Sequence, residues 1–306
     1  MTGNYLRRGL LALACVVAAL LSACGDSTIA STLKPTRIIV FGDSSADVGE
    51  VGGQRWTVND GSVNVWAEQV ANSYGQPLTP ASQGGLGYAS GGARVADVAA
   101  QMDAFLAHDS FGANDLVLVS MGVDEVYAQA AAYIAGQQSY EQLLAGVDKA
   151  GRDYGAQVKR LVDAGAKYVI AGGTWDLGNS PYALQIAQPG LLKQLSYAGQ
   201  TCTGCPRSFN EALLISINSL GNHVLYVDAA NYFNSVYENP IIYLGSGANV
   251  TDMVCTVQPV TGCTPATVLA GVSNYNLYLF AGPTYTTPNF NQLLGEYAYK
   301  AISSRW

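Results

Sequence analysis

The chain has 306 residues, of which 49% are hydrophobic and 12% charged, and its formal net charge is −7. This composition can bury a full core, which excludes a disordered protein, and the length suits one large α/β domain or two small ones. Without clustered lysine or arginine, the negative charge argues against a nucleic-acid partner, because phosphate binding requires positive charge.

The first residues have the pattern of an export signal. Arg7 and Arg8 precede an apolar stretch over 10–21 that is too short to span a bilayer as a stable helix. The stretch ends in Leu-Ser-Ala-Cys, which resembles the lipobox at which bacteria acylate a cysteine and cleave before it. We therefore expect a lipoprotein signal peptide over 1–23 and an acylated Cys24. The alternative is a plain signal peptide cleaved near the same place.

The residues around the cleavage site bear on where the protein is anchored. Residues 24–35 are expected to form a short tether between the lipid and the folded domain. Acyl chains at Cys24 would hold the protein on a membrane without a transmembrane helix. Gly25 stands where an aspartate would favour the inner membrane, so the lipobox resemblance implies export to the cell envelope and attachment to the outer membrane.

From residue 36 onward, segments with strand patterns and segments with helix patterns alternate. Continuous apolar runs predict strands that are buried on both faces at 37–41, 116–120, 168–171 and 224–227. Apolar residues at helical spacing predict helices over 95–106, over 143–162 after a capping box of Ser139 and Gln142, and after Pro288. This alternation predicts one domain over 36–306 with a central parallel sheet between two layers of helices.

Two stretches, 174–207 and 238–287, show no regular pattern. We expect them to be long loops over the carboxyl edge of the sheet, where folds of this class place their functional sites.

The clearest chemical signal is the run Phe-Gly-Asp-Ser-Ser-Ala-Asp at 41–47, directly after the first predicted strand. A serine on the tight turn that leaves a parallel strand is exposed, with backbone N–H groups of the next helix start beside it. Such a geometry favours a nucleophile and the anionic intermediate that it forms. Ser44 is therefore the candidate nucleophile.

This run resembles the Gly-Asp-Ser-x-x-Asp block of the SGNH/GDSL ester-hydrolase family. The run Gly-Tyr-Ala-Ser-Gly-Gly-Ala at 87–93 is similar to the family's second block, and the likeness continues to the C-terminus through 239–240 and 249–255. The resemblance implies a flavodoxin-like three-layer α/β/α sandwich, with a lipase or esterase activity. It also implies an oxyanion hole that includes the backbone N–H groups of Ser44 and of Gly92, or of Gly91 instead. A glycine turn that only permits close packing is the alternative interpretation of 87–93.

The third block of the family is Gly-x-Asn-Asp after a strand, where the asparagine donates to the oxyanion. The run Gly-Val-Asp-Glu at 122–125 fits this position, so Asp124 replaces the asparagine. A carboxylate cannot donate a hydrogen bond and would repel a developing oxyanion. The loss of one such donor typically costs about 10²–10³ in rate. Gly-Ala-Asn-Asp at 112–115 spells the motif but precedes the strand, so we interpret it as a chance match.

The last block of the family is Asp-x-x-His before a terminal helix. Gly282 and Tyr285 stand at these two positions. Glycine has no side chain, and a tyrosine with a pKa near about 10 is a poor general base at neutral pH. The two histidines, His108 and His223, lie elsewhere in the sequence, and we expect both to be structural or on the surface.

No other group of residues suggests catalysis. Asp228 and Asp252 are interpreted as ordinary loop or strand-end acids, whereas Asp43, Asp47, Asp124 or Glu125 could lie near Ser44. Since no cluster of histidines and carboxylates occurs, we expect neither a metal ion nor a cofactor.

Four cysteines follow the signal and the lipid site. In an oxidising compartment disulfides are the default, and the local pairing is favoured because each pair encloses a short loop. The predicted disulfides are Cys202–Cys205 and Cys255–Cys263. A zinc site or a redox-active pair at 202–205 is the alternative, which export and the surrounding Gly/Thr/Pro loop disfavour.

These observations leave three hypotheses. The first is an impaired or inactive family member that binds an acyl ester, a glycan or a peptide in the old cleft, because Asp124, Gly282 and Tyr285 replace the expected residues. The second is an active ester hydrolase or acyltransferase with a rewired base near Ser44. The third is an envelope scaffold protein.

Overall fold

The computed structural model describes residues 33–199 and 204–306, so the predicted signal peptide, Cys24, Cys202 and most of the tether lie outside it. Four parallel strands form the central sheet, in the order β1-β2-β3-β4. They are β1 (Arg37–Gly42), β2 (Asp115–Ser120), β3 (Tyr168–Gly172) and β4 (Val224–Val227). The four predicted strands are confirmed to within a residue at either end.

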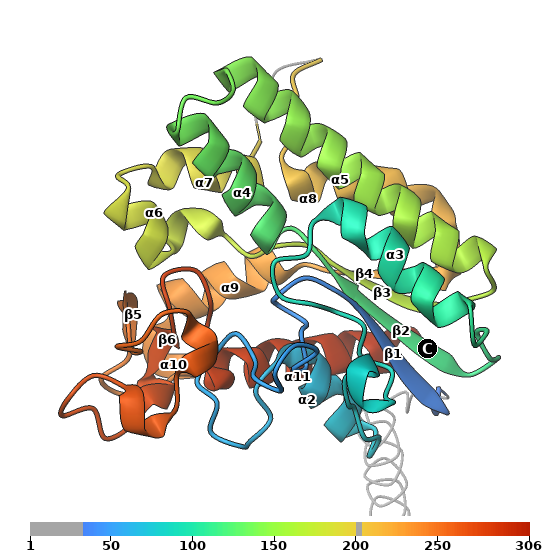
Figure 1. Ribbon diagram of the computed structural model, residues 1–306, viewed down its shortest axis with the longest axis horizontal. Helices are drawn as coiled ribbons and strands as arrows, with labels where there is room; N and C mark the ends of the chain where they lie inside the picture. The colour runs from blue at the N-terminus through green and yellow to red at the C-terminus, as the bar shows by residue number, and fades with distance from the viewer. Residues whose placement is uncertain (1–32, 200–203) are drawn as a thin grey trace, which may run out of the picture.

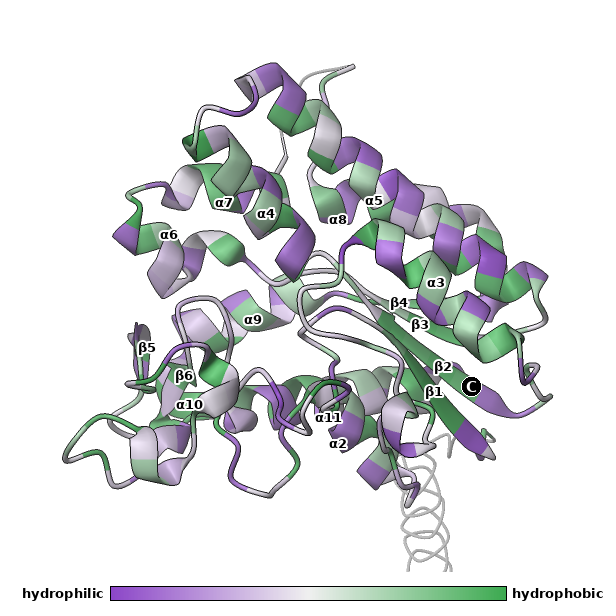
Figure 2. Cartoon of the chain, viewed as in Figure 1, coloured by the Kyte–Doolittle hydropathy of each residue, from purple (hydrophilic) through white to green (hydrophobic). Residues whose placement is uncertain are grey.

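Two layers of helices enclose this sheet (Figure 1). One face is covered by α3 (Val95–Leu106), α4 (Val123–Ile134), α5 (Tyr140–Asp163) and α8 (Phe209–Ile217). The other face is covered by α2 (Trp66–Ser73), α9 (Ala229–Glu238) and α11 (Pro288–Arg305). Figure 2 shows the central strands as largely hydrophobic, whereas α3 and α5 carry mixed surfaces, as expected for helices with one buried face. The three-layer α/β/α fold is confirmed.

A short segment extends the sheet beyond β1. The backbone N–H of Val40 donates to the carbonyl of Leu86 at 2.9 Å, and that of Tyr88 donates to the carbonyl of Val40 at 2.7 Å. With 86–88 counted as the second strand of the chain, the order of strands is the flavodoxin-like 2-1-3-4-5, which reverses direction beside β1. The crevice at that reversal is where doubly wound folds bind their ligands.

The two stretches that were expected to be long loops contain short regular elements, so this expectation is wrong in part. The first holds α6 (Pro181–Gln185) and α7 (Pro189–Ser196), and the second holds α10 (Pro240–Tyr243), β5 (Asn249–Met253) and β6 (Tyr278–Phe280). Each of these helices begins at a proline, which is preorganised for a first turn. With eight residues at most, they are too short to display a helical period.

A small second core lies beside the main one. It is formed by Val58, Val254, Cys255, Val260, Cys263 and Ala281. A disulfide joins Cys255 to Cys263, and Cys205 is also disulfide-bonded. The backbone N–H of Cys255 donates to the carbonyl of Ala281 at 2.9 Å, so this core fixes the segment that contains Gly282 and Tyr285.

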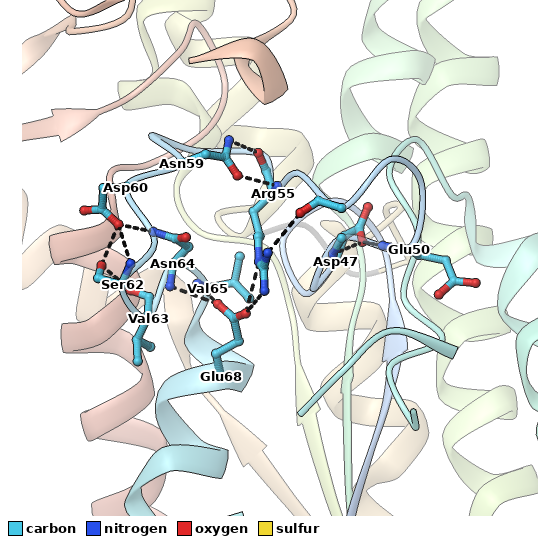
Figure 3. Close-up of polar contacts among 12 residues, drawn as sticks. Asp47, Glu50, Arg55, Asn59, Asp60, Ser62, Val63, Asn64, Val65 and Glu68 are labelled. Atoms are coloured by element: carbon cyan, nitrogen blue, oxygen red, sulfur yellow. Dashed lines mark hydrogen bonds and ion pairs between the residues drawn. The ribbon is translucent and has the colours of Figure 1, made fainter. Parts of the chain in front are cut away.

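The loop over 53–65 lies between β1 and α2 in the chain and contributes Val58 to the second core. Figure 3 shows its polar contacts. The Arg55 guanidinium donates to the Glu68 carboxylate at 2.5 and 3.0 Å and so ties the loop to α2. The Asn59 amide donates to the carbonyl of Thr261 at 3.1 Å. Trp56 lies between Arg55 and Asn59 in the sequence. The contacts of these two residues hold it near residues 281–287, the C-terminal segment.

Within the two described ranges, no helix is both long and apolar enough to cross a bilayer.

The turn that leaves β1 depends on Gly42, whose φ is +148° and whose added Cβ would lie 2.2 Å from the carbonyl oxygen of Ser120. We expect Gly42→Ala to lower the free energy of unfolding by about 3 kcal/mol or more, because both backbone strain and overlap oppose it. Gly61→Ala is the matched control, since its φ is also positive at +81° but its Cβ would meet nothing. Urea unfolding should show a loss of only about 1 kcal/mol there. Equal losses for the two variants would contradict this account.

Candidate functional site

Three neighbouring strands bring the candidate site together at the carboxyl edge of the sheet. Ser44 follows β1, Gly92 follows the segment 86–88, and Asp124 lies in the first turn of α4, just after β2. Because parallel strands end at the same edge, residues far apart in sequence meet here.

Asp43 holds the first turn of α4 against the exit of β1. Its Oδ2 accepts hydrogen bonds from the backbone N–H groups of Gly122, Val123 and Asp124 at 2.9, 3.0 and 3.4 Å. Its Oδ1 accepts from the N–H and the hydroxyl of Ser45. A carboxylate at a helix N-terminus satisfies donors that have no partner within the helix. This contact fixes Asp124 next to Ser44.

The central contact of the site is made by one carboxylate oxygen. Oδ2 of Asp124 accepts from the backbone N–H of Ser44 at 3.0 Å, from the Ser44 hydroxyl at 2.6 Å and from the N–H of Gly92 at 3.1 Å. The N–H of Gly92 also lies 2.9 Å from Oγ of Ser44. The two backbone donors that the sequence assigned to an oxyanion hole therefore converge on an oxygen of the protein itself.

Gly91 has a different partner from Gly92. Its N–H donates to Oδ2 of Asp47 at 2.8 Å, and the same oxygen accepts from the indole N–H of Trp56 at 3.3 Å. A side chain at Gly91 would overlap the Trp56 ring. Of the two glycines that the sequence left open, Gly92 is the one that faces Ser44.

Tyr285 covers the site from the C-terminal segment. Its hydroxyl donates to Oδ1 of Asp124 at 2.5 Å, and its ring lies 5.1 Å from the ring of Trp56. Burial, and then the charge of Asp124, raise the pKa of Tyr285 far above the ordinary value, so the hydroxyl stays protonated at neutral pH. Ser44 is only 1% exposed beneath these groups.

Val260 packs closely against Gly282. A Cβ added there would lie 3.2 Å from Cβ and Cγ2 of Val260, so the space that a larger residue would need is filled. The N–H of Gly282 donates to the carbonyl of Tyr285 at 3.1 Å, which closes a tight turn.

Both histidines lie at the opposite edge of the sheet from Ser44. His108 follows α3 and adjoins Asp109, whose carboxylate binds Arg37 at the start of β1, and His223 directly precedes β4. The chance match at 112–115 lies at that same edge, because the Asp115 carboxylate also binds Arg37.

The remaining acids that the sequence singled out have structural contacts. Asp228 caps α9 by accepting from the N–H of Asn231 at 3.0 Å, and Asp252 accepts from the amide of Asn249 at 2.8 Å. Glu125 lies 5% exposed and forms a two-pronged ion pair with Arg94. In the part of the chain that the structure describes, no three His, Cys, Asp or Glu side chains are grouped to hold a metal ion.

A cleft of about 460 Å³ opens above the site. It is lined by Gly92, Arg94, Asp124, Tyr127, Ala128, Ala131, Tyr182, Thr284 and Tyr285. Asp124 and Tyr285 reach this cleft, whereas Ser44 lies below them and does not line it. A ligand in the cleft would therefore meet a carboxylate before it met the serine.

The contacts that the sequence analysis did not anticipate are long-range. Asp43 adjoins the candidate nucleophile, but nothing in the sequence indicated that it would anchor α4. No sequence pattern indicated that Trp56 would pack on Tyr285 or Val260 on Gly282, since these contacts depend on the folding of two separate loops over the site.

The sequence matches a family model described as GDSL-like Lipase/Acylhydrolase over residues 38–245. A search of curated proteins gave no match. Similar solved structures include a member of the lipolytic G-D-S-L family from Veillonella parvula, with 12% identity over 86% of this chain and 95% of that one and a TM-score of 0.45. A variant of an acetyl xylan esterase from Geobacillus stearothermophilus shows 16% identity over 88% and 96%, with a TM-score of 0.48.

The burial of Asp43 predicts a pH dependence of stability. Burial, and secondly the charge of Asp124, raise the pKa of Asp43 from 3.8 to about 7. The folded protein then binds more protons than the unfolded chain between these values, so its stability falls as the pH rises from about 4 to about 7. Asp124→Asn removes the charge of Asp124. We therefore expect the loss of unfolding free energy between about pH 4 and about pH 7 to be smaller by roughly 1 kcal/mol in this variant.

Urea unfolding at pH 4.5 and pH 7.5 measures this difference. Asp163→Asn is the matched control, because Asp163 is an exposed acid at the end of α5 that pairs with Lys159. An equal slope in Asp124→Asn and in the control would show that the charge of Asp124 does not act on Asp43.

Proposed function

Since the chain belongs to the GDSL-like lipase/acylhydrolase family, we propose that it is a member that binds a ligand in the former ester site without hydrolysing esters at ordinary enzyme rates. The observation that carries this proposal is the position of Asp124. Its Oδ2 accepts from both backbone N–H groups that would otherwise stabilise an oxyanion, and from the Ser44 hydroxyl as well.

The electrostatic consequence of this position supports the proposal. Two unit charges about 4 Å apart repel by about 4 kcal/mol at an effective dielectric constant of about 20. An oxyanion formed beside Asp124 would be opposed by an energy of this order, which corresponds to a rate loss of roughly 10³. The N–H groups of Ser44 and Gly92 already donate to the Asp124 carboxylate and so cannot stabilise the intermediate.

Proton transfer from the serine to a histidine is also unsupported. By the motif resemblance, Tyr285 stands where the family has its histidine. Its hydroxyl is a protonated donor to Asp124. Both histidines lie at the far edge of the sheet. A serine hydroxyl without an adjacent imidazole lacks the base that usually activates it.

One observation favours an active enzyme with a rewired base. The Ser44 hydroxyl lies 2.6 Å from Asp124, which is within the distance at which a base accepts a proton. If Asp124 activates Ser44, a fluorophosphonate probe should label the wild type and fail to label Ser44→Ala. No labelling of either protein between pH 5 and pH 9 would remove this alternative.

The first candidate is tested by turnover of p-nitrophenyl acetate. We expect the wild type and Ser44→Ala to have kcat/KM values within about twofold of each other, because Ser44 contributes no catalysis above background. Turnover at ordinary enzyme rates, on the order of 10 s⁻¹, that disappeared in Ser44→Ala would refute the proposal.

Restoring the family residues should restore activity. A variant with Asp124→Asn, Gly282→Asp, Tyr285→His and Val260→Ala supplies an oxyanion donor and a Ser-His-Asp set, and removes the side chain that fills the space at Gly282. We expect its kcat/KM to exceed that of the same variant with Ser44→Ala by about 10² or more. A folded quadruple variant without this gain would show that Asp124 and its neighbours are not what suppresses hydrolysis.

We further propose that the protein is exported and held on the outer membrane by acyl chains at Cys24, on the strength of the lipobox pattern. In cell fractionation, wild type should be found with the membranes and Cys24→Ser in the soluble periplasmic fraction. A membrane-bound Cys24→Ser protein would contradict the proposed anchor.

A further inference from the structure

We propose that the cleft above Asp124 binds a small organic cation, such as an alkylammonium or quaternary ammonium head group. This inference rests on the proposed function, because it requires that the site holds a ligand without turning it over. It is carried by the charge of the cleft and by the aromatic side chains that line it.

The charge of the cleft is not balanced. The partners that the structure gives Asp124 are uncharged: the N–H and hydroxyl of Ser44, the N–H of Gly92 and the hydroxyl of Tyr285. Arg94 is the only lysine, arginine or histidine in the cleft lining, all of which belongs to the described ranges.

Arg94 is already engaged by another carboxylate. Its Nε and Nη2 donate to the two oxygens of Glu125 at 2.8 and 2.5 Å. Arg94 also attracts Asp97 and Asp124, so three carboxylates share one guanidinium and the acidic charge exceeds the basic charge here. A cationic ligand would compensate this excess, whereas a carboxylate or phosphate ligand would be repelled.

The aromatic side chains that line the cleft also suit a cation. Tyr127, Tyr182 and Tyr285 contribute rings from α4, α6 and the C-terminal segment. The rings of Tyr127 and Tyr182 meet edge to face, with centroids 5.3 Å apart and an interplanar angle of 87°. Aromatic ring faces attract ammonium groups, and recognition of quaternary ammonium is the best-known use of such walls.

Small side chains leave room between these rings. Ala128 and Ala131 lie on the side of α4 that lines the cleft, and Gly92 forms part of its inner wall. The volume of about 460 Å³ exceeds that of a trimethylammonium group and lies in the range of small-molecule sites. The acidic group and the rings therefore line an open cleft of suitable size.

Calorimetric titration with choline and with its uncharged isostere, 3,3-dimethylbutan-1-ol, tests the inference on the full chain. The two probes share shape and size and differ in charge. We expect choline to bind with a dissociation constant in the millimolar range or below, at least about tenfold tighter than the isostere. Equal affinities, or no choline binding at about 50 mM, would overturn the proposal.

Variants locate the site. Asp124→Asn should weaken choline binding about tenfold, whereas Asp163→Asn, which removes the same charge at the far edge of the sheet, should not change it. Tyr182→Leu should weaken binding about fivefold, and Tyr182→Phe, which keeps the ring, should bind as the wild type does. Binding that is unaffected by Asp124→Asn would place the cation elsewhere and refute the inference.

An absence of choline binding together with an absence of Ser44-dependent turnover would refute this inference alone and leave the proposed function standing.

Discussion

The site depends on one carboxylate oxygen that accepts three hydrogen bonds. Oδ2 of Asp124 binds the backbone N–H groups of Ser44 and Gly92 and the Ser44 hydroxyl, and so occupies the point at which the two backbone donors converge. The rest of the site follows from this contact. Tyr285 is positioned by the other oxygen of Asp124, and Ser44 is buried beneath both residues.

The fold itself imposes this arrangement. Asp43 binds the first three backbone N–H groups around the start of α4 and brings Asp124 to the exit of β1. In the family, as the resemblance implies, an asparagine at this position would point a donor at the reacting oxygen. The same backbone with a carboxylate instead saturates the anion site from within the protein, because a carboxylate can only accept. A difference of one oxygen for one nitrogen thus turns the expected hydrogen-bond donor into an acceptor.

Much of this could be predicted from the sequence, and the remainder has a physical reason. Buried strands and long helices show their periods over many residues, so β1 to β4, α3 and α5 could be identified from pattern alone. Comparison with motif blocks predicted roles for Ser44, Asp124, Gly282 and Tyr285, and the structure brings Ser44, Asp124 and Tyr285 together. Whether Asp124 would repel an oxyanion or fill its site depends on contacts between residues 80 positions apart, which no local pattern encodes. The same holds for Val260, which fills the space beside Gly282, and for Trp56, which packs on Tyr285.

A crystal structure determined at about pH 7 would show whether the Asp124 carboxylate fills the point where the N–H groups of Ser44 and Gly92 converge. We predict that Oδ2 of Asp124 lies within about 3.2 Å of the backbone nitrogens of both Ser44 and Gly92, with no water or ion between them. A structure in which the Asp124 side chain points into the cleft, and a water molecule or buffer anion bridges those two nitrogens, would contradict it.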